Sequence, residues 1–128
     1  MAGTLASLLA LSAHASPCTG VDRTLSDARR AALAPAIAHQ LTLPFVDVLQ
    51  SFRLKGWSIV YVDTHVSDER FLFYSADPLT GHAVTEWGGA ATRDEGDDIQ
   101  RWLLKNAPSI PPALARCFAW HVTQDRDQ

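Results

Sequence analysis

Hydrophobic positions in the first half of the chain recur at the spacing of an α-helix. The repeat starts after Thr24 and Ser26, whose hydroxyls can cap free backbone N–H groups, and it continues to about Leu41. Pro35 interrupts the repeat, because proline removes an interior hydrogen bond and clashes with the preceding turn. We therefore expect a kink at Pro35 or a helix that stops and restarts. The predicted buried stripe consists of Leu25, Ala28, Ala32, Leu33, Ala36, Ile37 and Leu41.

Alternation with a period of two begins after Gly56 and predicts three consecutive antiparallel strands. β-Branched and aromatic residues dominate these strands, and polar residues typical of turns separate them. The preceding segment, 45–54, is ambiguous between a short helix and a first strand. The predicted strands are 57–62, 71–75 and 82–87, and the turns between them are 65–70 and 77–81.

The pattern after Gly88 and Gly89 predicts a second helix. Thr92 and Glu95 have the T-x-x-E spacing of a capping box, which favours a helix from that point to about Asn106. The apolar stripe of this helix is predicted to consist of Ile99, Trp102 and Leu103.

Prolines separate this helix from a predicted closing strand over residues 118–123. Pro108 and Pro111 forbid a continued helix, although Pro112 can occupy the first turn of a short one through Ala115. The sequence therefore predicts an α+β fold in a single domain. Its antiparallel sheet would have about four strands, with an N-terminal helix, a second helix before the last strand, and the helices packed on one face of the sheet.

The first residues have the pattern of a secretory signal. An apolar, uncharged stretch covers residues 5–11, and Ala13-His14-Ala15 then resembles a cleavage site. We expect residues 1–15 to be a signal peptide and 16–128 to form the domain; the alternative is a buried N-terminal helix over 6–13. The stretch is far shorter than the roughly 20 residues of a membrane-spanning helix, so no stable membrane insertion is expected.

Two cysteines support a periplasmic or secreted location. Cys18 and Cys117 could pair in an oxidising compartment, and closing so long a loop would stabilise the fold by about 4 to 5 kcal/mol. The alternative is two unpaired buried thiols. Composition is that of a globular chain, with 47% hydrophobic and 20% charged residues. The net charge of −3, with both signs interspersed, argues against a nucleic-acid partner.

The densest cluster of polar residues lies between the first two secure strands. Carboxylates beside an imidazole could supply a general acid and base, or two or three ligands for a divalent ion. One short loop seldom completes a metal site, so we expect a solvated hairpin loop whose exposed side chains make binding contacts, without a metal or cofactor. The predicted contact residues of this loop are Asp63, His65, Asp68 and Glu69.

Other polar residues give no sign of catalysis. The acidic residues at 94–98 suit the first turn of a helix, and no serine lies in a G-x-S-x-G elbow. His82 and His121 would meet only if their predicted strands were neighbours. We therefore expect a protein that is not an enzyme. Among the aromatic residues, Trp87 is the candidate for an exposed binding anchor, because it directly precedes the Gly-Gly pair.

Three segments resemble those of small uncharacterised exported proteins of Gram-negative bacteria. They are 57–65, 102–111 and 117–123. The resemblance implies a periplasmic location and a single domain with paired cysteines. The order of a helix followed by a meander of strands also resembles cystatin-like folds, a likeness of architecture only.

The leading hypothesis is a periplasmic protein-binding module, a candidate inhibitor or immunity protein that blocks a cell-wall-acting enzyme in the envelope. Its acidic loop would complement a basic surface of that partner. The alternative is a small-ligand-binding protein or a small hydrolase with an apolar pocket between the sheet and the first helix. A third hypothesis is a structural component of the envelope.

Overall fold

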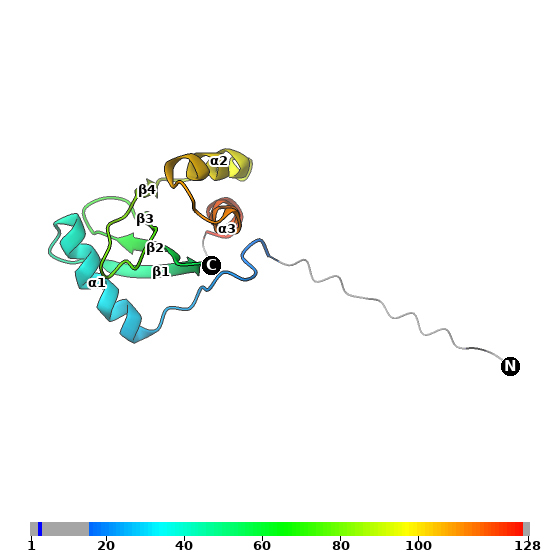
Figure 1. Cartoon of the computed structure of the whole chain (residues 1–128). Coiled ribbons are helices and arrows are strands. Elements are labelled where there is room, and N and C mark those ends of the chain that lie inside the picture. The colour runs from blue at the N-terminus through cyan, green and yellow to red at the C-terminus, as the bar shows by residue number, and fades with distance from the viewer. Residues whose placement is uncertain (1–2, 4–15, 127–128) are drawn as a thin grey trace.

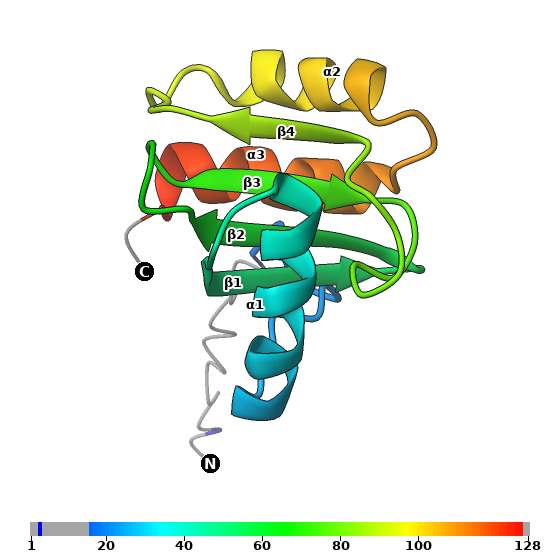
Figure 2. The ribbon, with the colours of Figure 1, turned by 90° about the vertical axis from the view of Figure 1, so that its left-hand side faces the viewer.

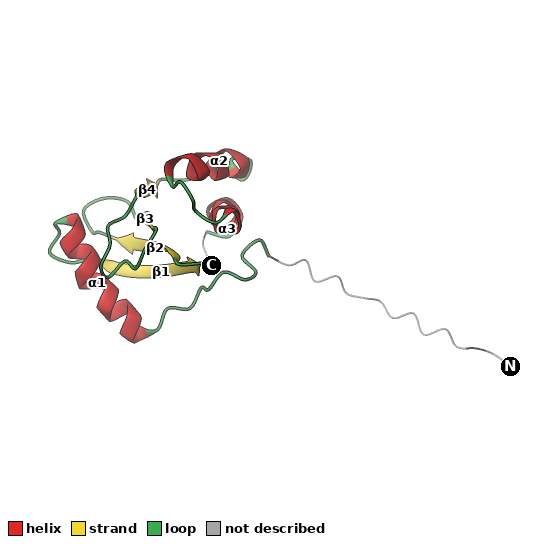
Figure 3. Cartoon of the chain, in the orientation of Figure 1, coloured by secondary structure: helices red, strands yellow, loops and turns green. Residues whose placement is uncertain are grey.

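A four-stranded antiparallel sheet with helices on both of its faces forms the centre of the protein (Figures 1 and 2). The computed structural model describes residue 3 and residues 16–126, which form a single α+β domain as predicted. The predicted signal peptide, residue 3 excepted, lies outside the described residues. Figure 3 distinguishes the helices from the strands, which are α1 (Asp27–Leu41), β1 (Asp47–Leu54), β2 (Trp57–Asp63), β3 (Arg70–Tyr74), β4 (Thr85–Gly88), α2 (Gly96–Asn106) and α3 (Pro112–Gln124).

The sheet has the simple order β1-β2-β3-β4, and every neighbouring pair is antiparallel. The ambiguous segment 45–54 therefore forms the first strand. Lys55 and Gly56 connect it to β2 with positive φ angles of 51° and 83°, which give the tight reversal that a hairpin needs. Leu49 is an extra residue in this ladder, because Val48 pairs with Val62 whereas Gln50 pairs with Tyr61.

Helix α1 begins and ends with defined caps. The Ser26 hydroxyl accepts a hydrogen bond from the Arg29 N–H at 3.1 Å, and Thr42 closes the helix in the left-handed conformation. The helix is continuous through Pro35 and does not stop and restart there. Leu33 and Ile37 pack with Val60, Leu72 and other residues of the strands, so α1 covers one face of the sheet.

Helices α2 and α3 lie on the opposite face (Figure 1). Phe118 of α3 packs edge-on against Phe71 and Phe73 of β3, with ring centroids 5.0 Å apart in both pairs. The prediction that the helices pack on one face was wrong. The reason lies in the central strands, because adjacent residues of β3 are buried on both faces and both faces therefore need a cover.

Residues 118–123 are helical and do not form the predicted closing strand. They belong to α3, which has Pro112 in its first turn, and β1 supplies the fourth strand of the sheet. Phe118, Trp120 and Val122 alternate as in a strand, but Leu114, Phe118 and Val122 also recur every four residues. The helical spacing prevails because these three side chains are buried together against the sheet.

Helix α2 starts later than the capping-box pattern suggested. Its first residue is Gly96, and Glu95 is the N-cap without a side-chain cap bond. Only one half of the box forms: the Thr92 N–H donates to Glu95 Oε2 at 2.7 Å, while the Thr92 hydroxyl donates to Asp94 instead.

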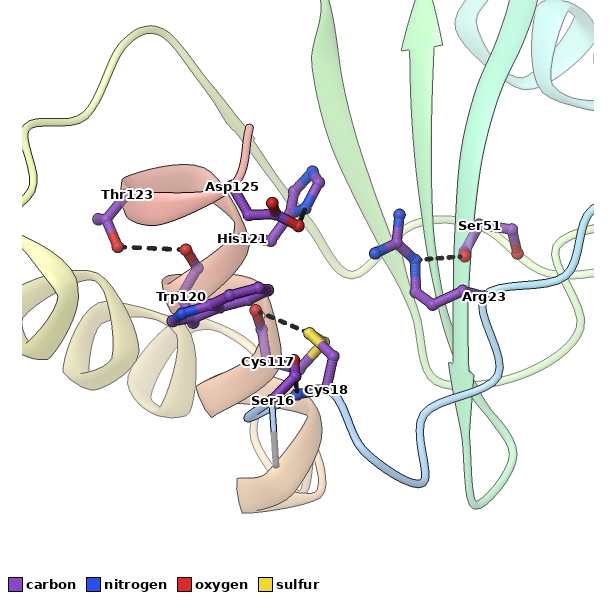
Figure 4. Close-up of a disulfide and its surroundings, with 9 residues drawn as sticks. All are labelled: Ser16, Cys18, Arg23, Ser51, Cys117, Trp120, His121, Thr123 and Asp125. Atoms are coloured by element: carbon purple, nitrogen blue, oxygen red, sulfur yellow. Dashed lines mark hydrogen bonds and ion pairs between the residues drawn. A yellow bond between two sulfur atoms is a disulfide. The ribbon is translucent and has the colours of Figure 1, made fainter. Parts of the chain in front are cut away.

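A disulfide between Cys18 and Cys117 joins the N-terminal segment to α3, which confirms the predicted pairing (Figure 4). The same segment also pairs with the sheet, where Asp22 and Arg53 exchange backbone hydrogen bonds of 2.9 and 2.8 Å. The N-terminal segment is therefore attached at two points. Within the described residues, no helix has the length and apolar character needed to cross a bilayer.

Candidate functional site

Two strands bring a histidine and two carboxylates together at one end of the sheet. Asp47 begins β1, Asp63 ends β2, and the two residues are direct partners across the ladder. His65 follows in the β2–β3 loop, with its Nε2 2.6 Å from Asp47 Oδ2 and its Nδ1 3.6 Å from Asp63 Oδ2. An ionised carboxylate only accepts hydrogen bonds, so Nε2 donates to Asp47.

Hydrogen bonds from His65 to both carboxylates offset an unfavourable charge pair. Like charges directly opposite each other destabilise a sheet, and Asp47 and Asp63 occupy such positions. His65 has a φ of 61°, and its backbone N–H donates to Asp63 Oδ1 at 2.8 Å. This bond holds the residue in the left-handed conformation that directs its ring between the two carboxylates.

The described surroundings of these three residues allow metal binding but do not provide a nucleophile. Asp47, Asp63 and His65 each offer one ligand atom, and these atoms lie within 4.8 Å of one another, so the set could hold a divalent ion through nitrogen and oxygen. The nearby hydroxyls point elsewhere: Ser67 Oγ lies 3.3 Å from Thr64 Oγ1 and accepts from Arg70 at 2.7 Å. Among the described residues, no hydroxyl is hydrogen-bonded to His65, as nucleophilic catalysis would require.

Exposed apolar side chains lie beside these charges. Phe45 is 58% exposed, and its ring centroid is 5.1 Å from that of His65; Val66, in the loop, is 69% exposed. Arg70 anchors this loop, since it also pairs with Glu86 of β4 at 3.3 Å. We call the resulting surface the acidic edge, defined as Phe45, Asp47, Asp63, His65, Val66, Asp68 and Glu69.

The structure brings the four predicted loop residues to one surface and adds Asp47 of β1 and Phe45, which lies just before β1. Asp63 and His65 are in contact, while Asp68 and Glu69 follow in the same loop. Sequence reasoning missed Phe45 and Asp47, which reach the loop only because β1 pairs with β2. Had 45–54 been read as a strand, the hairpin turn would have placed its start near Asp63.

Trp87 occupies a different place from the one expected of an exposed anchor. It is half-buried on β4, with its ring 5.6 Å from that of Phe118 and 6.1 Å from that of Phe71. The guanidinium of Arg126 lies 5.6 Å from the Trp87 ring centroid and covers part of what remains. Trp87 therefore belongs to the packing between the sheet and α3.

His121 is a second histidine in an unusual setting (Figure 4). It is fully buried in α3, packs edge-on against Phe52 at 5.0 Å, and neither ring nitrogen has a hydrogen-bond partner among the described residues. Burial lowers its pKa to about 4, and the nearby Arg23 and Arg126 act in the same direction while Asp125 opposes them. His82 is exposed on the α1 side, so the two histidines do not form one site.

Comparison with protein-family models, with curated proteins and with solved structures finds no match to this chain. The function must therefore be inferred from the chemistry of the molecule's own surface. The acidic edge is a part of that surface where charged and large apolar side chains are exposed together.

Proposed function

We propose that this protein is a periplasmic protein-binding module, an inhibitor or immunity protein, that contacts its partner through the acidic edge. One observation carries the proposal: Phe45 and Val66 are exposed large apolar side chains next to the carboxylates of that surface. Interfaces are commonly built in this way, with apolar anchors at the centre and a polar rim around them. The disulfide supports an exported location.

The charge of the acidic edge favours a partner with a basic surface. Asp47, Asp63, Asp68 and Glu69 gather four carboxylates there, with Arg70 as the neighbouring cation. Such an excess steers association with a positive cleft and selects against acidic proteins. A cell-wall-acting enzyme with a basic cleft is the partner class that we propose.

Capture of a partner from envelope extract, followed by calorimetric titration of the purified pair, tests the proposal. Asp68→Ala combined with Glu69→Ala should raise Kd at least about 10-fold, because it removes half of the carboxylates. Val66→Ala should also weaken binding, since it removes an anchor. The Tm of these variants should stay near that of the wild type, because the three side chains are exposed or half-buried and make no cross-element bonds among the described residues.

Asp97→Ala combined with Asp98→Ala is the matched control, since it removes an adjacent acidic pair from α2. This variant should bind the captured partner with unchanged Kd. If the two double variants bind alike, the acidic edge is not the contact surface and the proposal fails.

A further inference from the structure

A charged cavity lies at the end of the sheet opposite the acidic edge. The β1–β2 hairpin, the start of α1 and the β3–β4 loop border this cavity, which is open to solvent and has a volume of about 570 Å³. This volume is within the range of small-molecule sites. The lining residues that carry the argument are Asp22, Arg29, Arg53, Lys55, Ser58 and Asp77.

The cations of this cavity outnumber its carboxylates. Arg29 pairs with Asp77 at 3.2 Å, and Arg53 pairs with Asp22 at 2.9 Å, in each case through a single Nη2 atom. Lys55, at the tip of the hairpin, has no carboxylate partner among the described residues. The cavity thus has one uncompensated positive charge, and both guanidinium groups keep further N–H donors for a ligand.

The two carboxylates are held by groups of their own. Asp22 Oδ1 accepts bonds from the N–H and the hydroxyl of Thr24 at 2.9 and 2.6 Å, and Asp77 Oδ1 accepts from the Leu79 N–H at 3.0 Å. These bonds hold the pKa of both aspartates below the ordinary value, so both stay ionised. They act as supports that position the guanidinium groups rather than as open acceptors.

A hydroxyl without an intramolecular partner among the described residues lines the same cavity. Ser58 as a whole is only 6% exposed, but its hydroxyl oxygen reaches solvent and makes no hydrogen bond to any residue that the structure describes. A free hydroxyl at the surface of a cavity can both donate to a ligand and accept from it. Trp57, Leu54 and Pro78 supply apolar wall next to it.

We propose that this cavity binds a small polyhydroxylated ligand that carries an oxyanion, either a carboxylate or a phosphate. Arg53 and Lys55 would meet the oxyanion, because guanidinium and ammonium groups form charge-assisted hydrogen bonds with both kinds. The Ser58 hydroxyl would bond a hydroxyl of the ligand, and Trp57 would border its apolar face. The site is separate from the acidic edge and does not depend on the proposed protein partner.

Titration followed by amide NMR tests this inference with three probes on one sugar scaffold. Glucose 6-phosphate carries a phosphate, glucuronate a carboxylate, and glucose neither. At least one anionic sugar should cause saturable shifts at residues 54–58 with a Kd below about 1 mM in low salt. Glucose should cause none, and the stronger of the two anions identifies the class of oxyanion. Equal shifts with glucose, or no saturable shift with either anion, would overturn the proposal.

Substitutions at two residues that line the cavity distinguish an effect on ligand binding from an effect on folding. Lys55→Gln should raise Kd about 5-fold or more, and Ser58→Ala about 3-fold or more, since each removes one direct contact. Ser58→Ala should leave the Tm unchanged or higher, because the hydroxyl has no partner to lose. Lys105→Gln on α2 is the matched control and should bind as the wild type does. If Lys55→Gln and Lys105→Gln have the same Kd, the anion does not bind in this cavity.

Discussion

His121 makes the stability of this protein depend on pH. Its pKa is lowered to about 4 in the folded state, whereas an unfolded chain has the ordinary value of 6.5. The neutral ring therefore contributes stability above pH 6.5, and this contribution falls as the pH drops toward 4. From a pH of about 7 to about 5 we expect a loss of about 2 kcal/mol in the free energy of unfolding, measured by urea denaturation.

The variant His121→Phe isolates this effect, because it keeps a ring against Phe52 and removes the titrating group. Its stability should vary much less between these pH values than that of the wild type. Asp22, Asp77 and Asp94, whose pKa values are lowered, lose their contribution only at a pH below their ordinary value of 3.8. Parallel pH profiles of wild type and variant would show that His121 is not the responsible group.

The residues of the acidic edge were predictable as far as neighbours along the chain determine them. The loop with Asp63 and His65 follows from the alternation that ends at Asp63 and the polar residues after it. Asp47 was not predictable, because counting back from the Lys55-Gly56 turn places Val48 opposite Asp63. The bulge at Leu49 shifts the ladder by one residue and brings Asp47 there instead.

At the scale of the elements, the disulfide joins the N-terminal segment to α3. Cys18 and Cys117 are 99 residues apart, so their bond removes much conformational freedom from the unfolded chain. Replacing both with alanine should lower the free energy of unfolding by about 4 to 5 kcal/mol. Urea denaturation of the wild type and the double variant measures the difference.

Reduction provides the control for the alanine variant. Dithiothreitol should destabilise the wild type by a similar amount and should leave the double variant unchanged. A wild type whose urea midpoint does not move on reduction would contradict the structural role of this bond.

The error over α3 shows where a periodic pattern is ambiguous. Phe118 and Val122 satisfy both a period of two and a helical spacing, and over six residues neither can be preferred. The deciding information lies outside that window. Leu114 extends the helical stripe by one turn, and Pro112 can begin a helix whose last residues then follow without a break.

At the scale of the whole molecule, the two faces of the sheet should unfold together. The tryptophans report on one face only, since Trp57 and Trp87 pack in the core beneath α2 and α3, Trp102 is part of α2 and Trp120 is part of α3. Leu33 is a buried residue of α1 and packs against the other face. Leu33→Ala should destabilise the protein by about 2 to 5 kcal/mol, and tryptophan fluorescence should shift to the same urea midpoint as circular dichroism.

Arg30→Ala provides the comparison on the same helix, at an exposed position where we expect a change within about 0.5 kcal/mol. Should Leu33→Ala move the circular dichroism midpoint and leave tryptophan fluorescence in place, the two faces would be independent folding units.

The fold class could be predicted because the N-terminal helix and the meander of β2, β3 and β4 are local patterns. The helices that pack against each face of the sheet were harder to predict from the sequence. Both faces of β3 are buried, from Phe71 to Tyr74, but the sequence does not show which helix covers which face. The charged cavity was also missed, since Arg29, Arg53 and Asp77 come from three segments and meet only in the folded chain. The small-ligand alternative had expected an apolar pocket.

The pairing of Asp22 with Arg53 has a consequence for self-association. β1 is an outer strand, and outer strands can add strands from other molecules and grow into fibrils. Asp22 occupies the backbone groups of Arg53, and the Arg23 side chain donates to the Ser51 carbonyl at 3.3 Å. The N-terminal segment thus covers the margin of the sheet at Ser51 and Arg53 and hinders the addition of a strand from another molecule there.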